Sequence, residues 1–289
     1  MNSDPQVHKS ADALVSQRFS MLEDIAKELA GHVSFPVCFD VAIHLRDTLR
    51  KPDISPHELI RLVRMEPLIS ARLLHLANSP KKNRSRLAIV EIEKAVVHLG
   101  VEVARNAAIA VSAEQLMGSR NLVVFSDVSE ALWNHSLKTA AGARVIARQM
   151  TALDPDEAMT AGLMHDLGAF YMLYRASQYE ELRIRPETAK HLIALWHKSI
   201  GESLMYALGL PEQIIEAIRE RDDSDAIVDM PRSLGDVVFV ANLLAGRAFT
   251  MLAGESGPPI ARPELLHPPY LALAREIEDE YRELRRALP

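Results

Sequence analysis

Residues 157–173 read EAMTAGLMHDLGAFYML, and this stretch decides the fold. Its apolar residues recur at helical spacing, and just before it Asp154-Pro155 supplies an acidic N-cap followed by a proline suited to the first helical position. The pattern predicts one helix that begins there and runs through Leu167. His165 and Asp166 are then neighbours on that helix, about 100° apart around its axis, so both side chains can reach one ion beside it.

Helical periodicity also fills most of the remaining chain, and strand-like alternation is scarce. Ser55-Pro56-His57-Glu58 has the form of a capping box that opens another helix, and proline or glycine marks most of the breaks. The sequence therefore predicts an all-α fold, a multi-helix bundle. Besides the helices after Ser55 and Asp154, helices are expected near 11–30, 38–50, 68–77, 91–98, 101–117, 128–149, 187–207, 211–220, 232–252 and 268–287.

The chain is expected to have four parts, and irregular stretches mark two of the three boundaries between them. GSRNLVVFSD, residues 118–127, is the expected boundary between two helical lobes, and residues 253–269 form a looser linker rich in glycine and proline. We expect an N-terminal extension at 1–19, an N-terminal helical lobe at 20–118, a central helical lobe at 119–252, and a linker with a C-terminal helix at 253–289. That last helix is expected to pack on the body, with a homodimer contact as the alternative.

The composition limits the classes of partner. Lys and Arg total 33 against 39 for Asp and Glu, which gives a net charge of -6 and argues against nucleic acid as a partner. Cys38 is the only cysteine, so neither a disulfide framework nor a cysteine zinc site is expected. No apolar leader is evident, and no apolar run approaches the roughly 20 residues that span a bilayer. We expect a cytoplasmic protein without a membrane partner.

Histidines upstream and downstream could complete a site with the His165-Asp166 pair. His135 lies 30 residues upstream (165 − 135) and His197 lies 32 downstream (197 − 165), each on its own predicted helix. Imidazole and carboxylate groups on facing helices suit a divalent zinc, iron or manganese ion. A buried histidine that pairs with a carboxylate for packing alone is the alternative. The neighbouring Trp133 and Trp196 are predicted to lie in the core.

Several motifs in a fixed order resemble one family. The central runs are ALWNHSLKTAAGARVIA, DEAMTAGLMHDLGAFYML and LWHKSIGESLMYALGLPEQIIEAI, at residues 131–147, 156–173 and 195–218. They resemble the HD superfamily of metal-dependent phosphohydrolases. EPLISARLLHLANSP (66–80), IEKAVVHLGVEVARNAAI (92–109) and Phe35-Pro36 narrow the resemblance to the related HDOD family. The likeness covers roughly residues 20 to 225. It implies an HDOD-type N-terminal lobe and an HD-like central lobe.

The resemblance carries over to the site only in part. His135, His165 and Asp166 match the metal ligands of HD enzymes, and His197 matches a downstream histidine of many members. Arg221 and Asn242 stand where ligating histidine and aspartate residues are usual, and a guanidinium repels a cation while an amide lacks negative charge. The resemblance thus implies no catalytic residues and no two-metal centre. His135, His165 and Asp166 could hold one residual zinc, iron, manganese or nickel ion, although no cofactor is required. His197, Arg221 and Asn242 are candidates for lining a pocket.

The resemblance implies a bacterial signal-transduction regulator of the HDOD type. It would be non-catalytic, would act through a signalling protein partner or a small ligand, and would serve as an output module of two-component or cyclic-dinucleotide signalling. The competing hypothesis is an active metal-dependent phosphohydrolase that acts on a nucleotide or a cyclic dinucleotide. A purely structural scaffold is the third hypothesis, and nucleic-acid binding is the weakest because of the net charge.

Overall fold

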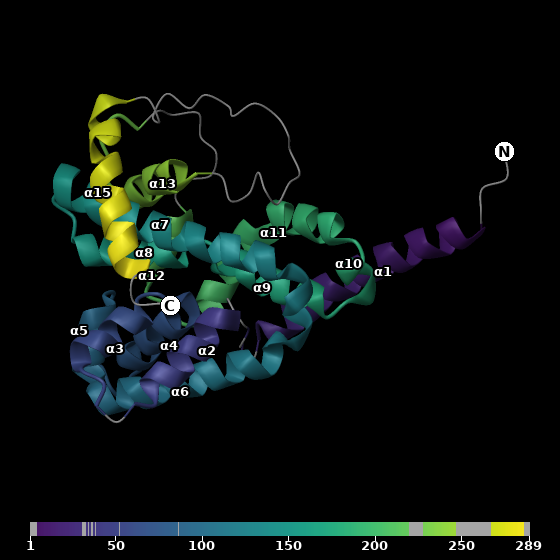
Figure 1. Ribbon diagram of the computed structural model, residues 1–289, viewed down its shortest axis with the longest axis horizontal. Helices are drawn as coiled ribbons and strands as arrows, with labels where there is room; N and C mark the ends of the chain where they lie inside the picture. The colour runs from purple at the N-terminus through teal and green to yellow at the C-terminus, as the bar shows by residue number, and fades with distance from the viewer. Residues whose placement is uncertain are drawn as a thin grey trace.

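The computed structural model describes residues 5–30, 33, 35, 37, 39–51, 53–85, 87–219, 228–246 and 267–285. Within these ranges the chain forms helices and no strands, as the helical periodicity predicts. Figure 1 shows α2 to α6 together on one side of the molecule, with α7 to α13 and α15 on the other. The linker predicted at 253–269 lies mostly outside the described residues.

Each predicted helical stretch corresponds to a helix, with ends that differ by up to six residues where they are described. Residues 38, 220, 247–252 and 286–287 of the predicted helices lie outside the described residues. The 3-10 helix η1 and the short α10 were not predicted. The bounds are α1 Pro5–Glu28, α2 Phe39–Leu49, α3 Pro56–Val63, α4 Pro67–Asn78, α5 Ile92–Leu99, α6 Val101–Gly118, η1 Ser119–Phe125, α7 Ser126–Met150, α8 Pro155–Met164, α9 Leu167–Ser177, α10 Glu180–Arg183, α11 Pro186–Ala207, α12 Glu212–Arg219, α13 Leu234–Ala245 and α15 Pro268–Arg285.

The predicted helix through Leu167 is wrong in one respect, because the chain breaks at the His165-Asp166 pair. α8 ends at Met164, α9 begins at Leu167, and Asp166 has φ −106° and ψ 17°, outside the helical region. The periodicity cannot reveal this break because buried apolar residues continue on both sides of it. The pair therefore lies at a junction between two helices and not on one helix.

Side-chain hydrogen bonds mark the starts of α3 and α4 and the end of α4, and the one at Ser55 is the predicted cap. The Ser55 hydroxyl accepts the Glu58 N–H at 3.1 Å, and the Glu66 carboxylate accepts the Ile69 N–H at 2.5 Å at the start of α4. At the other end of α4, the Asn78 amide donates to the Ile89 carbonyl at 2.7 Å. The Ser55 and Glu66 contacts satisfy N–H groups that a helix start leaves without partners, and the Asn78 contact joins the end of α4 to the loop before α5.

Helix α7 is the axis of the central lobe, with α8, α13 and α15 packed along it. The C-terminal helix α15 is fixed by charge as well as by its apolar face, since Arg144 on α7 pairs with Glu280 at 2.7 Å. At the opposite end, α1 lies against α9 and α10. There Glu28 accepts a hydrogen bond from the Tyr171 hydroxyl at 2.9 Å and pairs with Arg175 at 2.8 Å.

The two tryptophans have different surroundings. Trp133 is buried, and its indole N–H donates to the Met65 carbonyl at 2.9 Å, which ties α7 to the turn between α3 and α4. Trp196 is 44% exposed on α11, so the prediction that it lies in the core is wrong. The apolar spacing of α11 does not show which of its faces is covered.

In the described part of the chain, no single helix has the length and apolar composition to cross a membrane. The apolar pair Ile92–Leu99 and Val101–Gln115 meets those criteria together, but it is bent by 114°.

The crossing of α9 and α11 depends on a contact between backbones. A Cβ atom on Gly168 would lie 2.1 Å from the His197 carbonyl oxygen and 2.6 Å from the Gly201 Cα. A Cβ atom on Gly201 would meet the Gly168 backbone at 3.4 Å, which is ordinary van der Waals contact. The crossing therefore requires glycine at position 168 and tolerates a methyl group at 201.

We expect Gly168→Ala to lower the free energy of unfolding by about 3 kcal/mol, because the backbones of α9 and α11 must move apart. Gly201→Ala, on the other side of the same crossing, should change the free energy by less than about 1 kcal/mol. Urea unfolding followed by circular dichroism measures both. Equal losses in the two variants would show that the crossing is not as close as described.

A buried carboxyl group at the start of α4 is a second consequence of the packing. Glu66 is 1% exposed, and its desolvation raises the pKa to about 7, although the hydrogen bond from the Ile69 N–H opposes the shift. A folded-state pKa above the unfolded value means that the folded protein binds the proton more tightly between about pH 4.5 and pH 7. Stability from this group is therefore present below pH 4.5 and is lost as the pH rises through 7.

We expect Glu66→Gln to remove this loss, because glutamine keeps an oxygen for the Ile69 N–H and carries no charge. At pH 8 the variant should exceed the wild type in unfolding free energy by up to about 3 kcal/mol, and at pH 4 the two should be similar. Denaturant titrations at both pH values test this, with the exposed Glu102→Gln as the control. A difference independent of pH would contradict the assignment.

Candidate functional site

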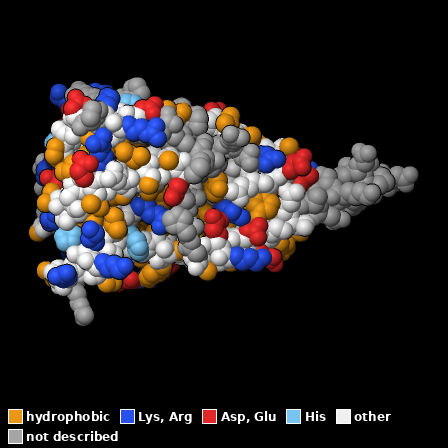
Figure 2. All heavy atoms as spheres, turned by 90° about the horizontal axis from the view of Figure 1, so that it is seen from below, with side chains coloured by type: hydrophobic (Ala, Val, Ile, Leu, Met, Phe, Trp, Pro, Cys, Tyr) orange, Lys and Arg blue, Asp and Glu red, His pale blue; other side chains and the backbone are white. Residues whose placement is uncertain are grey.

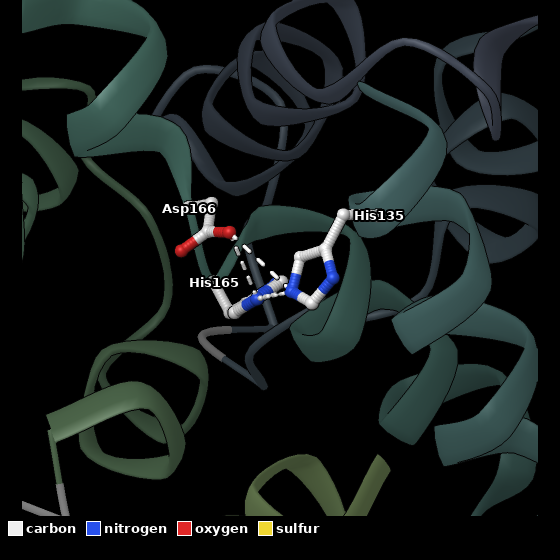
Figure 3. A group of neighbouring side chains, drawn as sticks. All are labelled: His135, His165 and Asp166. Atoms are coloured by element: carbon white, nitrogen blue, oxygen red, sulfur yellow. Dashed lines mark hydrogen bonds and ion pairs between the residues drawn. The ribbon is translucent and has the colours of Figure 1, made fainter. Parts of the chain in front are cut away.

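The candidate site lies where α7 passes the junction between α8 and α9. His135 extends from α7. Figure 3 shows its imidazole ring facing the imidazole ring of His165 and the carboxylate of Asp166. The three side chains are only 5%, 6% and 3% exposed. The site is therefore an internal polar cluster between helices.

The position of His165 follows from the close packing of α8 on α7. A Cβ atom on Gly162 would lie 3.0 Å from the Ala140 Cα, so glycine allows the two helices to approach. The Gly162 carbonyl, in the last turn of α8, accepts a hydrogen bond from His165 Nδ1 at 2.8 Å. This bond orients the ring and leaves Nε2 toward His135 and Asp166.

The donor atoms converge on one point. His165 Nε2 lies 3.3 Å from His135 Nε2 and 3.1 Å from Asp166 Oδ2, and His135 Nε2 lies 3.7 Å from the same oxygen. Asp166 Oδ2 is buried and lacks a well-aligned hydrogen-bond donor despite the short distance to His165. Ligands about 2.1 Å from one metal ion lie roughly 3 to 3.5 Å from each other. Two of the three separations fall in this range and the third, 3.7 Å, is slightly longer, so a small adjustment would let the three atoms hold a single divalent cation.

Charge within the cluster is balanced by the cluster itself. Burial alone would raise the pKa of Asp166, but His165, His135 and His197 lower it to about 2. Burial works to lower the pKa of His165, yet the adjacent Asp166 raises it above its ordinary value. Desolvation lowers the pKa of His135 to about 4. At neutral pH Asp166 is therefore ionised and His135 is neutral, and His165 holds its proton more tightly than a free imidazole does.

The helix ends favour the same charges. His165 stands at the C-terminus of α8, where carbonyl groups favour a cation, and Asp166 stands at the N-terminus of α9, where N–H groups favour an anion. A metal ion would compete with a proton for His165 Nε2, so its binding would weaken as the pH falls.

The remaining predicted residues have separate outcomes. Asn242, on α13, lies beside His135, and its Oδ1 is 2.9 Å from His135 Nε2. His197, on α11, donates from Nδ1 to the Ile193 carbonyl at 2.9 Å, and burial lowers its pKa. It lies close enough to Asp166 for its charge to affect that carboxylate. Arg221 lies outside the described residues.

If bound, a divalent cation held by His135, His165 and Asp166 would supply Lewis acidity. Asn242 could offer it an amide oxygen, but one without negative charge. The role of the Gly162 carbonyl was not predicted from the sequence. A histidine three residues after Gly162 at a helix end can bond the Gly162 carbonyl. This spacing could have predicted the contact if the helix end had been recognised.

A second group of carboxylates comprises Glu91, Asp154 and Asp156. Each of them has a cationic partner, since Lys94 lies within ion-pair distance of Glu91 and Asp154, and Arg144 lies 3.0 Å from Asp156. The pair of Lys94 with Asp154 joins α5 to the start of α8, and the pair of Arg144 with Asp156 joins α7 to α8. The ion pairs with Lys94 and Arg144 therefore account for this group of carboxylates.

Comparison with known proteins identifies the fold. The MmoQ response regulator from Methylococcus capsulatus is 22% identical, with 89% of this chain and 98% of that chain covered and a TM-score of 0.62. A fragment of the same regulator is 22% identical, with 80% of this chain and 89% of the fragment covered and a TM-score of 0.56. A Shewanella amazonensis protein with a provisional metal-dependent phosphohydrolase name is 20% identical, with 92% and 99% covered and a TM-score of 0.45. At 22% identity the likeness to the two MmoQ structures shows the fold alone.

No curated protein matches the chain. The family model of the HDOD domain matches residues 35–224, more than half of the chain, and spans the turn at Glu66 as well as His135, His165 and Asp166. The chain therefore belongs to the HDOD domain family.

Proposed function

We propose that this protein is a non-catalytic HDOD regulator of signal transduction, in which the cluster at His135, His165 and Asp166 joins helices and does not hydrolyse phosphate esters. The observation that carries the proposal is burial, since the three side chains are 3% to 6% exposed. A phosphoryl group must contact a catalytic metal directly, and these donor atoms are covered by the helices that present them.

The ligand set supports the same proposal. Two-metal hydrolysis needs a bridging carboxylate and further ligands for the second ion. Among the described residues, Asp166 is the only carboxylate in the converging group. The neighbouring polar group is the Asn242 amide, which already binds His135. At most one weakly held cation is therefore expected.

The family and its relatives support a signalling role. HDOD membership is combined here with similarity in fold to a protein named as a response regulator. We infer that the chain relays a signal through a partner protein or a small ligand, as an output module of two-component or cyclic-dinucleotide signalling. The phosphohydrolase remains the competing function, and the convergence of three donor atoms is the observation that favours it.

We expect protein purified without chelator to show no hydrolysis of bis(p-nitrophenyl) phosphate or cyclic dinucleotides above that of His165→Ala, with manganese, zinc or iron added. The reason is that substrate cannot reach the buried donor atoms. Phosphate release and chromatography of the nucleotides measure the turnover. Turnover that requires stoichiometric metal and is lost in His165→Ala would establish the hydrolase instead.

Asn242→Asp should strengthen manganese or zinc binding by about tenfold or more, because a carboxylate replaces a neutral amide beside His135. Isothermal titration of chelator-treated protein measures the affinity. Asn106→Asp, at an exposed position on α6, adds the same charge away from the site and should bind as the wild type does. Equal affinities for all three proteins would mean that Asn242 does not adjoin the metal position.

A further inference from the structure

The connection from α4 to α5 is a loop whose described residues are joined by hydrogen bonds, at one end of the N-terminal lobe. The Asn83 N–H donates to the Ser79 carbonyl at 2.9 Å, and the Asn83 side chain donates to the Leu87 carbonyl at 2.6 Å. Asn78 closes the loop through its bond to the Ile89 carbonyl. Because Asn83 is buried and these bonds cross the loop, its exposed side chains are presented from a fixed backbone.

Positive charge gathers on this loop. Lys81, Lys82 and Arg84 are all exposed, and none of them lies within ion-pair distance of a carboxylate among the described residues. Two other cations of the same lobe do have carboxylate partners, since Arg64 pairs with Glu93 and Lys94 pairs with Glu91. Three like charges held close together repel one another, and an anionic partner would relieve that repulsion.

Exposed apolar side chains adjoin these cations. His98 on α5 donates from Nε2 to the Lys82 carbonyl at 3.2 Å, which places the end of α5 beside the loop. The adjacent Val97 is 72% exposed, and Leu87 is 76% exposed. Figure 2 views the molecule from the side of the N-terminal lobe, and at the left end of this face Lys, Arg and His side chains lie among hydrophobic ones.

We propose that Lys81, Lys82, Arg84, Leu87 and Val97, here called the basic-apolar surface, dock an acidic segment of a partner protein that also carries apolar side chains. Carboxylates would pair with the loop cations, and apolar side chains would cover Leu87 and Val97, as in interfaces with an apolar centre and a charged rim. The inference rests on the proposed regulatory function, for which it names the kind of partner.

Other anionic partners fit the surface less well. These five residues include no aromatic side chain on which a nucleic-acid base could stack, and the net charge of -6 would repel a long polyanion beyond the surface. Anionic membranes are typically recognised by about four to eight clustered cations, and the loop sequence, with Lys81, Lys82, Arg84 and Arg86, reaches only the lower limit of that number. A short acidic protein segment needs neither feature.

Fluorescence anisotropy of the full-length protein tests the proposal, with a labelled peptide of alternating Glu and Leu as the probe. Lys81→Glu combined with Lys82→Glu should weaken binding by about tenfold or more, since two attractive contacts become repulsive. Leu87→Ser should weaken it several-fold. Arg50→Glu combined with Lys51→Glu changes the same charge at another exposed pair and should leave the affinity within about twofold of the wild type.

Two further probes are a single-stranded DNA oligonucleotide and phosphatidylserine-phosphatidylcholine vesicles. Binding of either one in preference to the peptide, equal losses in both charge-reversed variants, or no peptide binding by the wild type would overturn the proposal. His165→Ala should bind the peptide as the wild type does if it remains folded, which circular dichroism checks. Peptide binding and phosphodiester turnover are thus read separately, so that failure of one proposal is distinguishable from failure of the other.

Discussion

The junction between α8 and α9 places His165 at the end of one helix and the ionised Asp166 at the start of the next. His165 donates a hydrogen bond to the Gly162 carbonyl, which has no partner within α8. Asp166 lies at the start of α9, where the helix N–H groups favour negative charge. The two side chains stabilise each other in a buried environment where an isolated charge would be costly. The approach of α8 to α7 and the crossing of α9 with α11 both begin at this junction, through Gly162 and Gly168. The arrangement of the central lobe therefore depends on it.

Most of the helices could be predicted from the sequence, but the break between α8 and α9 could not. Proline after Ser55 and Asp154 predicted helix starts that the structure contains, because capping is a local interaction between neighbouring residues. The break at His165-Asp166 escaped prediction because apolar residues continue at helical spacing through it. Which face of a helix is covered is also a tertiary property, and Trp196 shows this, since it is exposed where spacing predicted core. Spacing alone likewise could not show that Asn242 would lie within hydrogen-bonding distance of His135.

The cluster and the basic-apolar surface suggest a division of roles between the lobes. In the central lobe, ionisable groups are buried, balanced and in contact with one another, which suits a structural junction. On the N-terminal lobe, cations and apolar side chains are exposed on a fixed loop, which suits recognition. The ion pairs from Arg64 and Lys94 to the start of α8 connect the two regions. A partner docked at the loop would therefore lie on the same lobe as Arg64 and Lys94, whose ion pairs reach the start of α8.

The central claim is that the His135, His165 and Asp166 cluster is a closed junction and not a hydrolytic centre. A crystal structure of the protein soaked with manganese and a nucleoside monophosphate, with anomalous scattering to locate the metal, tests it most directly. One manganese ion at most is predicted, between His135 Nε2, His165 Nε2 and Asp166 Oδ2, with no phosphate oxygen in contact. Two manganese ions bridged by Asp166, with a phosphate oxygen bound to either, would contradict the claim.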